Sequence, residues 1–333
     1  MIILVMVLIY FCFKLFWPTT YNVQLSSGRD STEYWDLKTG SRIAYTFLPA
    51  KDSAKPPFPI IYLHGGPGAG ITDREIETYA MLADSGYNVY LYDQIGCGYS
   101  GRLANIEEYT AERHKQDLLE IVKTIGSEKV ILVGQSWGSI LATRFVADHT
   151  ELVEKIIITA PAPIQPARKE LETVSPPDTL NLQMPPYSNK KANESVASMR
   201  SNLVRWAARK YGIKLAGDTE ADAFATYFTS VLNKGMVCDT ANAVVAEGSE
   251  GLYVHYITLK SLAKLQDQRS ILKSLNTPVL VMKAQCDNQP WGYTTEYLDI
   301  FRNHEFRYIK NAGHNIFLEQ PDVYVNTIID FLR

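Results

Sequence analysis

The chain has 333 residues, of which 46% are hydrophobic and 21% are charged, and its formal net charge is −3. These values are ordinary for a globular protein with one large domain, with or without an insertion. A weakly negative charge with no long basic run excludes the electrostatic footprint of a nucleic-acid-binding protein, so we expect no nucleic-acid partner. The four cysteines are too few and too scattered for a disulfide framework, and no metal-ligand motif is present, so we expect no metal site.

The first 17 residues, MIILVMVLIYFCFKLFW, are apolar except for Lys14. As a helix they would span roughly 25 Å, just short of the ~30 Å hydrocarbon core of a bilayer. Positive charge does not precede the run and no small-residue cleavage site follows it, which argues against a cleaved signal peptide. We therefore predict a single-pass membrane anchor at 1–17 and a membrane localisation, with a buried N-terminal helix as the alternative. Lys14 and Arg29 are too few to decide which side of the membrane holds the remainder of the chain.

After a linker at 18–31, residues 32–162 are expected to form the first part of a core domain. STEYWDL and SRIAYTFLP flank Thr39-Gly40 and predict a β-hairpin. Further strands are predicted in PPFPIIYLHGG, YNVYLYDQ, KVILV and KIIITAPA, with helices in EEYTAERHKQDLLEIVKTIG and SILATRFVADH. Strands that alternate with helices predict a parallel sheet with helices on both faces.

The alternation stops between 163 and 274, which predicts a helical insertion. This stretch opens with a proline-rich segment and continues with the helical patterns ESVASMRSNLVRWAARKYG, ADAFATYFTSVLN and LYVHYITLKSLAKLQDQRSILKSL. The strand pattern resumes in 275–333, the second part of the core. It holds the strand TPVLVMKA, the helix YTTEYLDIF, the strand HEFRYIK and the final helix PDVYVNTIIDFL.

Between the strand KVILV and the helix that follows it lies G-x-S-x-G, made of Gly134, Ser136 and Gly138. A serine at a sharp strand-to-helix turn is held in a strained conformation that projects its oxygen clear of the sheet, as a nucleophile requires. The alternative is that Ser136 is a helix N-cap and that the glycines are turn residues.

A serine nucleophile needs a histidine as base and an acid that orients this histidine. His314 directly follows the strand EFRYIK, and Asp287 follows the strand TPVLVMKA, so both stand where polar groups gather at the carboxyl ends of strands. The order Ser136, Asp287, His314 is the chain order typical of this motif. The histidines at other positions are expected to be surface or satisfied core residues: His114, His149, His255 and His304.

The oxyanion formed by nucleophilic attack needs two backbone N–H donors. Trp137, directly after the serine, is one candidate, and Gly66 in the loop HGGPGAG is the other. His64 is expected to hold this loop through its side chain. The segment GCGYSG matches the dinucleotide fingerprint G-x-G-x-x-G, but a helix should start at once after it, and RLANIEEYT intervenes. Dinucleotide binding at this segment is therefore disfavoured.

The segments HGGPG, DQIGCGYS and GQSWGS, with CD at 286–287 and AGH at 312–314, resemble the α/β-hydrolase superfamily and, within it, the proline iminopeptidase-like serine peptidases. The resemblance spans residues 32 to the end. It implies an α/β-hydrolase fold with a helical cap at 163–274, Ser136 as nucleophile, Asp287 as acid and His314 as base. It also implies release of N-terminal residues, often proline, from short peptides without a cofactor.

The family commonly carries a glutamate two positions before a His-Tyr pair in the cap, where it holds the free amine of the substrate. Here the pair is His255-Tyr256 and the matching position is Tyr253. Glu247 and Glu250 are the candidates that would replace the missing carboxylate, with surface charges as the alternative reading.

Three functions compete. The first is a serine aminopeptidase. The second keeps the same machinery but acts on an ester, a lactone or a lipid-like amide. The third is a binding protein that retains the fold without catalysis, which fold alone never excludes. Whether Cys97 or Cys286, both beside the candidate site loops, confers thiol sensitivity is left open.

Overall fold

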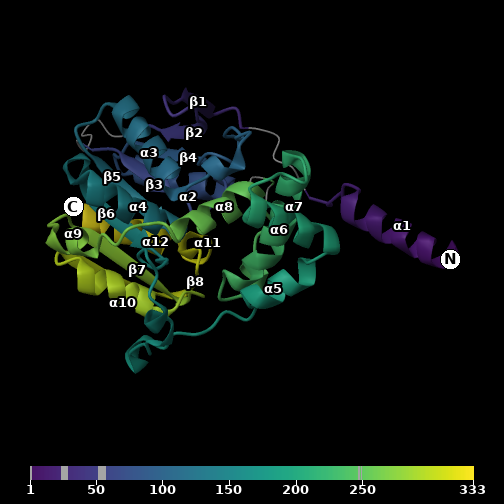
Figure 1. Ribbon diagram of the computed structural model, residues 1–333. Helices are drawn as coiled ribbons and strands as arrows, with labels where there is room; N and C mark the ends of the chain where they lie inside the picture. Colours follow the sequence, from purple (N-terminus) through teal and green to yellow (C-terminus); the bar gives the residue numbers. More distant parts are fainter. Residues whose placement is uncertain (1, 24–28, 52–57, 247, 249) are drawn as a thin grey trace.

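The computed structural model describes residues 2–23, 29–51, 58–246, 248 and 250–333. Eight strands form one sheet in the order β1-β2-β4-β3-β5-β6-β7-β8 (Figure 1). Their bounds are β1 Thr32–Asp36, β2 Arg42–Leu48, β3 Ile60–Leu63, β4 Val89–Tyr92, β5 Val130–Gln135, β6 Val153–Thr159, β7 Val279–Cys286 and β8 His304–Gly313. The predicted hairpin is confirmed, since β1 pairs with β2 antiparallel.

The sheet is mostly parallel. The pairs β3–β4, β3–β5, β5–β6, β6–β7 and β7–β8 are parallel, and only β1–β2 and β2–β4 are antiparallel. Every residue of β3 and of β5 is buried, as expected for central strands that are covered on both faces. The carboxyl ends of β3, β5, β7 and β8 therefore lie along one edge of the sheet.

Helices cover both faces of the sheet, as the alternation of patterns predicts. The core helices are α2 Asp73–Asp84, α3 Ala111–Ile125, α4 Trp137–Asp148, α10 Trp291–Ile300, α11 Ile316–Glu319 and α12 Pro321–Leu332. One hydrophobic cluster contains side chains of α3, α4 and α10, and a second contains side chains of α2, α11 and α12. The neighbours Ile60 and Ile61 of β3 enter different clusters, because successive side chains of a strand point to opposite faces.

The insertion is helical, but its helices are shorter than their patterns. It contains α5 Asn189–Val196, α6 Met199–Tyr211, α7 Asp218–Leu232, α8 Leu252–Leu262 and α9 Arg269–Ser274. The pattern at 194–212 spans the end of α5 and all of α6, because Ser198 caps α6 and forms a capping box with Ser201. The pattern at 252–275 likewise divides into α8 and α9.

The sequence patterns missed two core helices, α2 and the four-residue α11. The start of α2 is a capping box in which Thr72 accepts the N–H of Glu75 and the Glu75 side chain accepts the N–H of Thr72. A Thr three residues before a Glu is a recognisable signal for the start of a helix. Here it directly follows the glycine-rich loop HGGPGAG, which was interpreted from the sequence only as part of the candidate site.

The prediction of a membrane anchor at 1–17 is wrong. Helix α1, Ile2–Phe16, has 15 residues, which corresponds to about 22 Å of helix. Among the described residues no helix has both the length and the apolar content that crossing a bilayer requires. The predicted membrane partner and membrane localisation are withdrawn with it.

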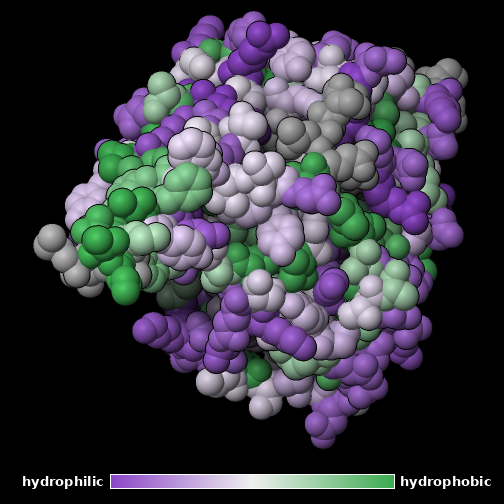
Figure 2. Space-filling view, turned by 90° about the vertical axis from the view of Figure 1, so that its right-hand side faces the viewer, coloured by the Kyte–Doolittle hydropathy of each residue, from purple (hydrophilic) through white to green (hydrophobic). Residues whose placement is uncertain are grey.

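The alternative of a buried N-terminal helix is not observed either. Helix α1 projects from the end of the molecule that carries α6 and α7 (Figure 1), and hydrophobic side chains gather on this face (Figure 2). The apolar side chains that the structure describes on it are largely exposed; Ile3, for example, is 79% exposed. The base of the helix is held by Arg200, which donates to the Leu15 carbonyl at 2.9 Å and forms an ion pair with Glu220.

The packing of α4 on β3 generates a stability prediction. A Cβ at Gly138 would lie 1.9 Å from the carbonyl oxygen of Leu63, whereas a Cβ at Gly217 would meet nothing within 4 Å. We expect Gly138→Ala to lower the free energy of unfolding by about 3 kcal/mol or more, because backbone rather than a flexible side chain must move. Urea unfolding followed by circular dichroism measures this change, with Gly217→Ala as the matched control. Equal midpoints for the two variants would contradict the packing argument.

Candidate active site

Ser136 occupies a strained turn between β5 and α4. Its φ is 53° and its ψ is −114°, a region that non-glycine residues adopt only where the surrounding structure holds them. The flanking glycines are sterically required, since a Cβ at Gly134 would lie 2.5 Å from the carbonyl oxygen of Gly138. Ser136 stands at the N-cap position of α4, but its side chain makes no capping hydrogen bond to the helix, unlike a serine that stabilises a helix start.

Asp287 and His314 follow the neighbouring strands β7 and β8 and meet beyond their ends. Nδ1 of His314 lies 2.7 Å from Oδ1 of Asp287, and both side chains are buried. The carboxylate accepts, so Nδ1 carries the proton and Nε2 is left as an acceptor. Burial by itself would raise the pKa of Asp287, but Lys283 and then His314 outweigh it and hold this pKa well below its usual range. The carboxylate is therefore ionised at neutral pH.

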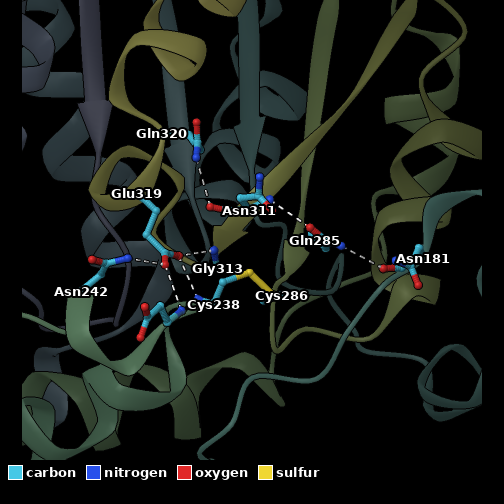
Figure 3. Close-up of a disulfide and its surroundings, with 10 residues drawn as sticks. Asn181, Cys238, Asn242, Gln285, Cys286, Asn311, Gly313, Glu319 and Gln320 are labelled. Atoms are coloured by element: carbon cyan, nitrogen blue, oxygen red, sulfur yellow. Dashed lines mark hydrogen bonds between the residues drawn. A yellow bond between two sulfur atoms is a disulfide. The ribbon is translucent and has the colours of Figure 1, made fainter.

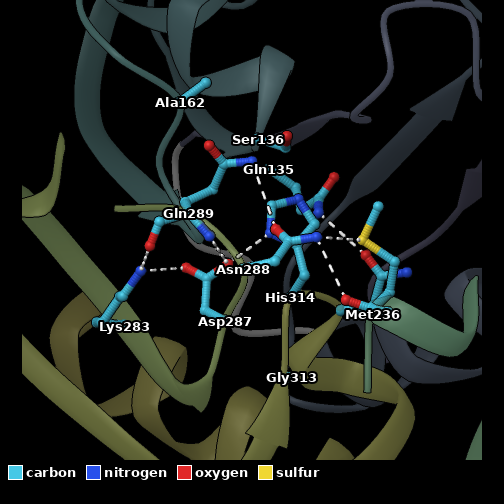
Figure 4. A network of polar contacts seen from close by, with 12 residues as sticks. Gln135, Ser136, Ala162, Met236, Lys283, Asp287, Asn288, Gln289, Gly313 and His314 are labelled. Atoms are coloured by element: carbon cyan, nitrogen blue, oxygen red, sulfur yellow. Dashed lines mark hydrogen bonds and ion pairs between the residues drawn. The ribbon is translucent and has the colours of Figure 1, made fainter. Parts of the chain in front are cut away.

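Ser136 and His314 border the same pocket, which has a volume of about 360 Å³, and Figure 4 shows Ser136 and Gln135 beside the imidazole. Gln135 donates to the side-chain oxygen of Asn315 at 3.0 Å. This hydrogen bond joins the residue before Ser136 to the residue after His314. The loops after β5 and β8 are therefore fixed relative to each other.

The glycine-rich loop after β3 also borders this pocket. Gly66 has a φ of 116°, and a Cβ there would lie 2.6 Å from the N atom of Gly68, so only glycine fits this turn. His64 holds the loop, as expected: its Nε2 accepts the N–H of Gln94 at 3.0 Å, and its Nδ1 lies 2.9 Å from the Gly65 carbonyl. Burial lowers the pKa of His64 to about 4, so its ring is neutral at neutral pH.

Gln94 connects this loop to the nucleophile turn, and sequence reasoning did not single it out. Its side-chain oxygen accepts the indole N–H of Trp137 at 2.8 Å, and its side-chain nitrogen donates to the His64 carbonyl at 3.1 Å. The two candidate oxyanion donors, on Gly66 and Trp137, therefore belong to segments that one hydrogen-bond network braces.

The residues of the insertion that were singled out from the sequence differ in their position relative to the pocket. Glu250 lines the pocket and is 7% exposed, whereas Glu247 lies outside the described residues. Tyr253 is buried away from the pocket lining, and its hydroxyl donates to the Ala216 carbonyl at 2.6 Å. His255, expected to be a surface or core residue, lines the pocket, and its Nδ1 lies 2.8 Å from the Pro67 carbonyl.

A disulfide ties the insertion to the candidate site, although the cysteine count gave no sign of it. Cys238 pairs with Cys286, which directly precedes Asp287. Beside this disulfide, the Glu319 carboxylate accepts the N–H groups of Cys238 and Gly313, each at 2.8 Å (Figure 3). Cys286, directly before Asp287, is thus bonded to Cys238, and Gly313, directly before His314, shares the Glu319 carboxylate with Cys238.

The apolar wall of the pocket comes mainly from the insertion. The lining side chains of this kind are Ala225, Phe228, Leu232, Met236, Val244, Val245, Ala246 and Leu252, together with Phe317 and Leu318 from the core. Among the described residues, no group of three or more histidine, cysteine, aspartate or glutamate side chains is placed to hold a metal ion.

Comparison with known proteins gives consistent matches. A family model described as the alpha/beta hydrolase fold matches residues 59–321. The proline iminopeptidase of Heyndrickxia coagulans is 22% identical over 306 residues, covering 89% of this chain and 96% of that protein. The proline iminopeptidase of Clostridioides difficile (strain 630) is 37% identical over 91 residues, which cover 27% of this chain and 30% of the relative.

Solved structures share the fold over most of the chain. The esterase EaEST from Exiguobacterium antarcticum superposes with a TM-score of 0.62 at 16% identity, covering 90% of this chain and 98% of the esterase. Crystal structures of the N-acyl homoserine lactonase AidH match with a TM-score of 0.57 at 17% identity, covering 91% of this chain and 96% of the lactonase chain.

The disulfide generates a prediction about stability and reactivity. Its two cysteines are 48 residues apart, and closing a loop of this length stabilises the folded state by up to about 4 kcal/mol. We expect Cys238→Ser with Cys286→Ser to lower the thermal midpoint and to slow fluorophosphonate labelling of Ser136. The exposed Cys12, replaced by Ser, is the matched control. Unchanged melting and labelling in the double variant would show that the bridge has no such role.

Proposed function

Because the chain belongs to the alpha/beta hydrolase fold family and is a serine hydrolase, we propose that Ser136, His314 and Asp287 are its nucleophile, base and acid. The 2.7 Å contact between His314 and Asp287 is the observation that carries this proposal. The strained backbone of Ser136 and its place on the same pocket as His314 support it further.

In this mechanism the Ser136 hydroxyl attacks the carbonyl carbon of the substrate while Nε2 of His314 takes its proton. Asp287 holds the opposite edge of the ring and stabilises the imidazolium that forms. The backbone N–H groups of Trp137 and Gly66 are the proposed donors to the oxyanion. His314 then gives the proton to the leaving group, and a water molecule activated by the same histidine releases the acyl group from Ser136.

The proposed substrate is a short peptide or a similar amide with a free N-terminal amine, proline foremost. Glu250 supports this choice, because a carboxylate buried in the pocket supplies the counter-charge that a desolvated ammonium needs. A second carboxylate, that of Glu75, also lines the pocket and accepts hydrogen bonds from Tyr62 and Thr72. The relatives named proline iminopeptidase support the same substrate class.

We assign residues 163–274 as a cap domain over the core of 32–162 and 275–333. The cap contributes the apolar wall of the pocket and, through α8, rests on the glycine-rich loop: the N–H of Gly251 donates to the Gly68 carbonyl at 2.8 Å. A pocket of about 360 Å³ is at the small end of the range for ligand sites and suits one residue or a small acyl group.

Hydrolysis of a small ester or lactone is the second candidate. The apolar wall that Phe228, Leu232 and Val244 contribute favours it, since such a surface binds an acyl chain without any charged group. The two candidates differ in the role of Glu250, which an ester without an amine does not need.

The substrate proposal predicts a selective effect of Glu250→Gln. We expect the wild-type protein to release nitroaniline from prolyl-p-nitroanilide in a reaction that depends on Ser136. In Glu250→Gln the KM for this substrate should rise about 10- to 100-fold, because a charged hydrogen bond to the substrate amine is lost. The rate with p-nitrophenyl acetate should change little. Steady-state kinetics of the full chain measure both.

Ser136→Ala is the blank for these measurements, and Glu194→Gln, an exposed glutamate of the cap, is the matched control. If a fluorophosphonate labels Ser136 but prolyl-p-nitroanilide is not cleaved, the ester or lactone candidate replaces the peptidase.

A further inference from the structure

Lys283 is a buried lysine on β7, the strand beside the edge strand β8. It lies four residues before Asp287 and is 1% exposed. Lysine is seldom fully buried, because an ammonium group loses its hydration there and must be compensated by partners. In sequence Lys283 interrupts the apolar run of TPVLVMKA, and the fold gives no structural reason for a charge at this position.

The partners of Lys283 belong to the candidate active site (Figure 4). Its Nζ donates to Oδ2 of Asp287 at 2.7 Å and to the carbonyl of Gln289 at 2.6 Å. The other carboxylate oxygen, Oδ1, accepts from Nδ1 of His314 at 2.7 Å and from the N–H of Gln289 at 3.1 Å. Asp287 therefore stands between the Lys283 amino group and the His314 imidazole, with one oxygen directed to each.

This arrangement has two physical consequences. The two oxygens are fixed by donors on opposite sides, so the carboxylate is prevented from rotating away from the His314 ring. The ammonium also cancels part of the negative charge that the ring senses, and in a dry interior such a charge acts strongly over a few ångströms. Less negative charge beside the ring means less stabilisation of the imidazolium.

In the part of the chain that the structure describes, three other titratable groups on the elements that pack against β7 form no hydrogen bond or ion pair with the Asp287 carboxylate. Tyr308 is the β8 residue in register with Lys283, and Glu319 of α11 accepts the N–H of Gly313. On α10, Glu296 is paired with Arg269 of α9 at 2.8 Å. The ammonium of Lys283 is thus the cation in direct contact with the Asp287 carboxylate.

We propose that Lys283 is a positioning residue that fixes the Asp287 carboxylate and, by partly neutralising it, keeps the His314 imidazole unprotonated to lower pH than an unpaired aspartate–histidine couple would allow. This inference rests on the roles proposed above for Ser136, His314 and Asp287. According to this inference, Lys283 helps to set the pH range of the enzyme although it does not contact the substrate.

The test compares Lys283→Met with the wild-type full chain in the rate of fluorophosphonate labelling of Ser136 across a pH series. We expect the plateau rate to fall about tenfold, since the orientation of the carboxylate is relaxed. We expect the acid limb of the profile to move upward by about one pH unit, because the imidazolium gains stabilisation when the cation is removed. A role in packing alone would lower the plateau without moving the limb.

Lys283→Gln separates the two effects and covers the case in which the methionine variant does not fold. Glutamine keeps a donor but carries no charge, so the plateau rate should recover in part while the acid limb stays displaced. Lys115→Met is the matched control, since Lys115 is a buried lysine that pairs with Asp148 away from the pocket, and its profile should match the wild type.

A second measurement does not depend on turnover. The low-field proton resonance of the hydrogen bond between His314 and Asp287, assigned by its loss in His314→Gln, reports protonation of the imidazole directly. A midpoint that is the same in wild type and both Lys283 variants would overturn the proposal for Lys283. Undiminished fluorophosphonate labelling of Ser136→Ala would instead overturn the proposed nucleophile, so the two failures are distinct.

Discussion

The site depends on one close backbone contact, that of Gly138 against the carbonyl of Leu63. This contact lets the first turn of α4 lie directly over the end of β3, which forces the chain at Ser136 into a conformation that few residues adopt. It also places the glycine-rich loop after β3 beside the loop after β5. His64, Gln94 and Trp137 then brace these loops with buried hydrogen bonds. The strain at Ser136 is thus maintained by the packed region around it together with its own backbone hydrogen bonds, since its N–H donates to the Thr159 carbonyl at 3.1 Å and its carbonyl accepts the N–H of Ser139 at 2.9 Å.

Much of the site could be predicted because its signals are local. A glycine on either side of Ser136 and the position of Asp287 and His314 directly after strand patterns are readable over a few residues. Their meeting in space follows from adjacent parallel strands, whose carboxyl ends share an edge. Glu250 could be named as a candidate because it stands in the cap close to the His-Tyr pair, although the pattern gave no sign of its burial in the pocket.

The features that could not be predicted depend on which way a side chain points or on contacts between distant segments. In the sequence, Lys283 is a single polar residue in an apolar strand pattern, and only the fold shows that it donates a hydrogen bond to Asp287. Cys238 and Cys286 are separated by 48 residues, with no spacing rule that pairs them. Hydropathy alone suggested an anchor in the N-terminal run, whereas the described helix is too short, and Arg200 of α6 holds its base.

The helical insertion is attached to the core at two points beside the pocket. The chain from Cys238 to Gly251 carries Val244, Ala246 and Glu250 into the pocket. At one end it is covalently joined to the strand that presents Asp287, and at the other it is hydrogen-bonded to the glycine-rich loop. Val244, Ala246 and Glu250 therefore lie between two points at which the insertion is joined to the core. With Asp287 acting as proposed above, a ligand too large for this wall would shift the strand end that presents the acid, so that misfit would slow turnover as well as weaken binding.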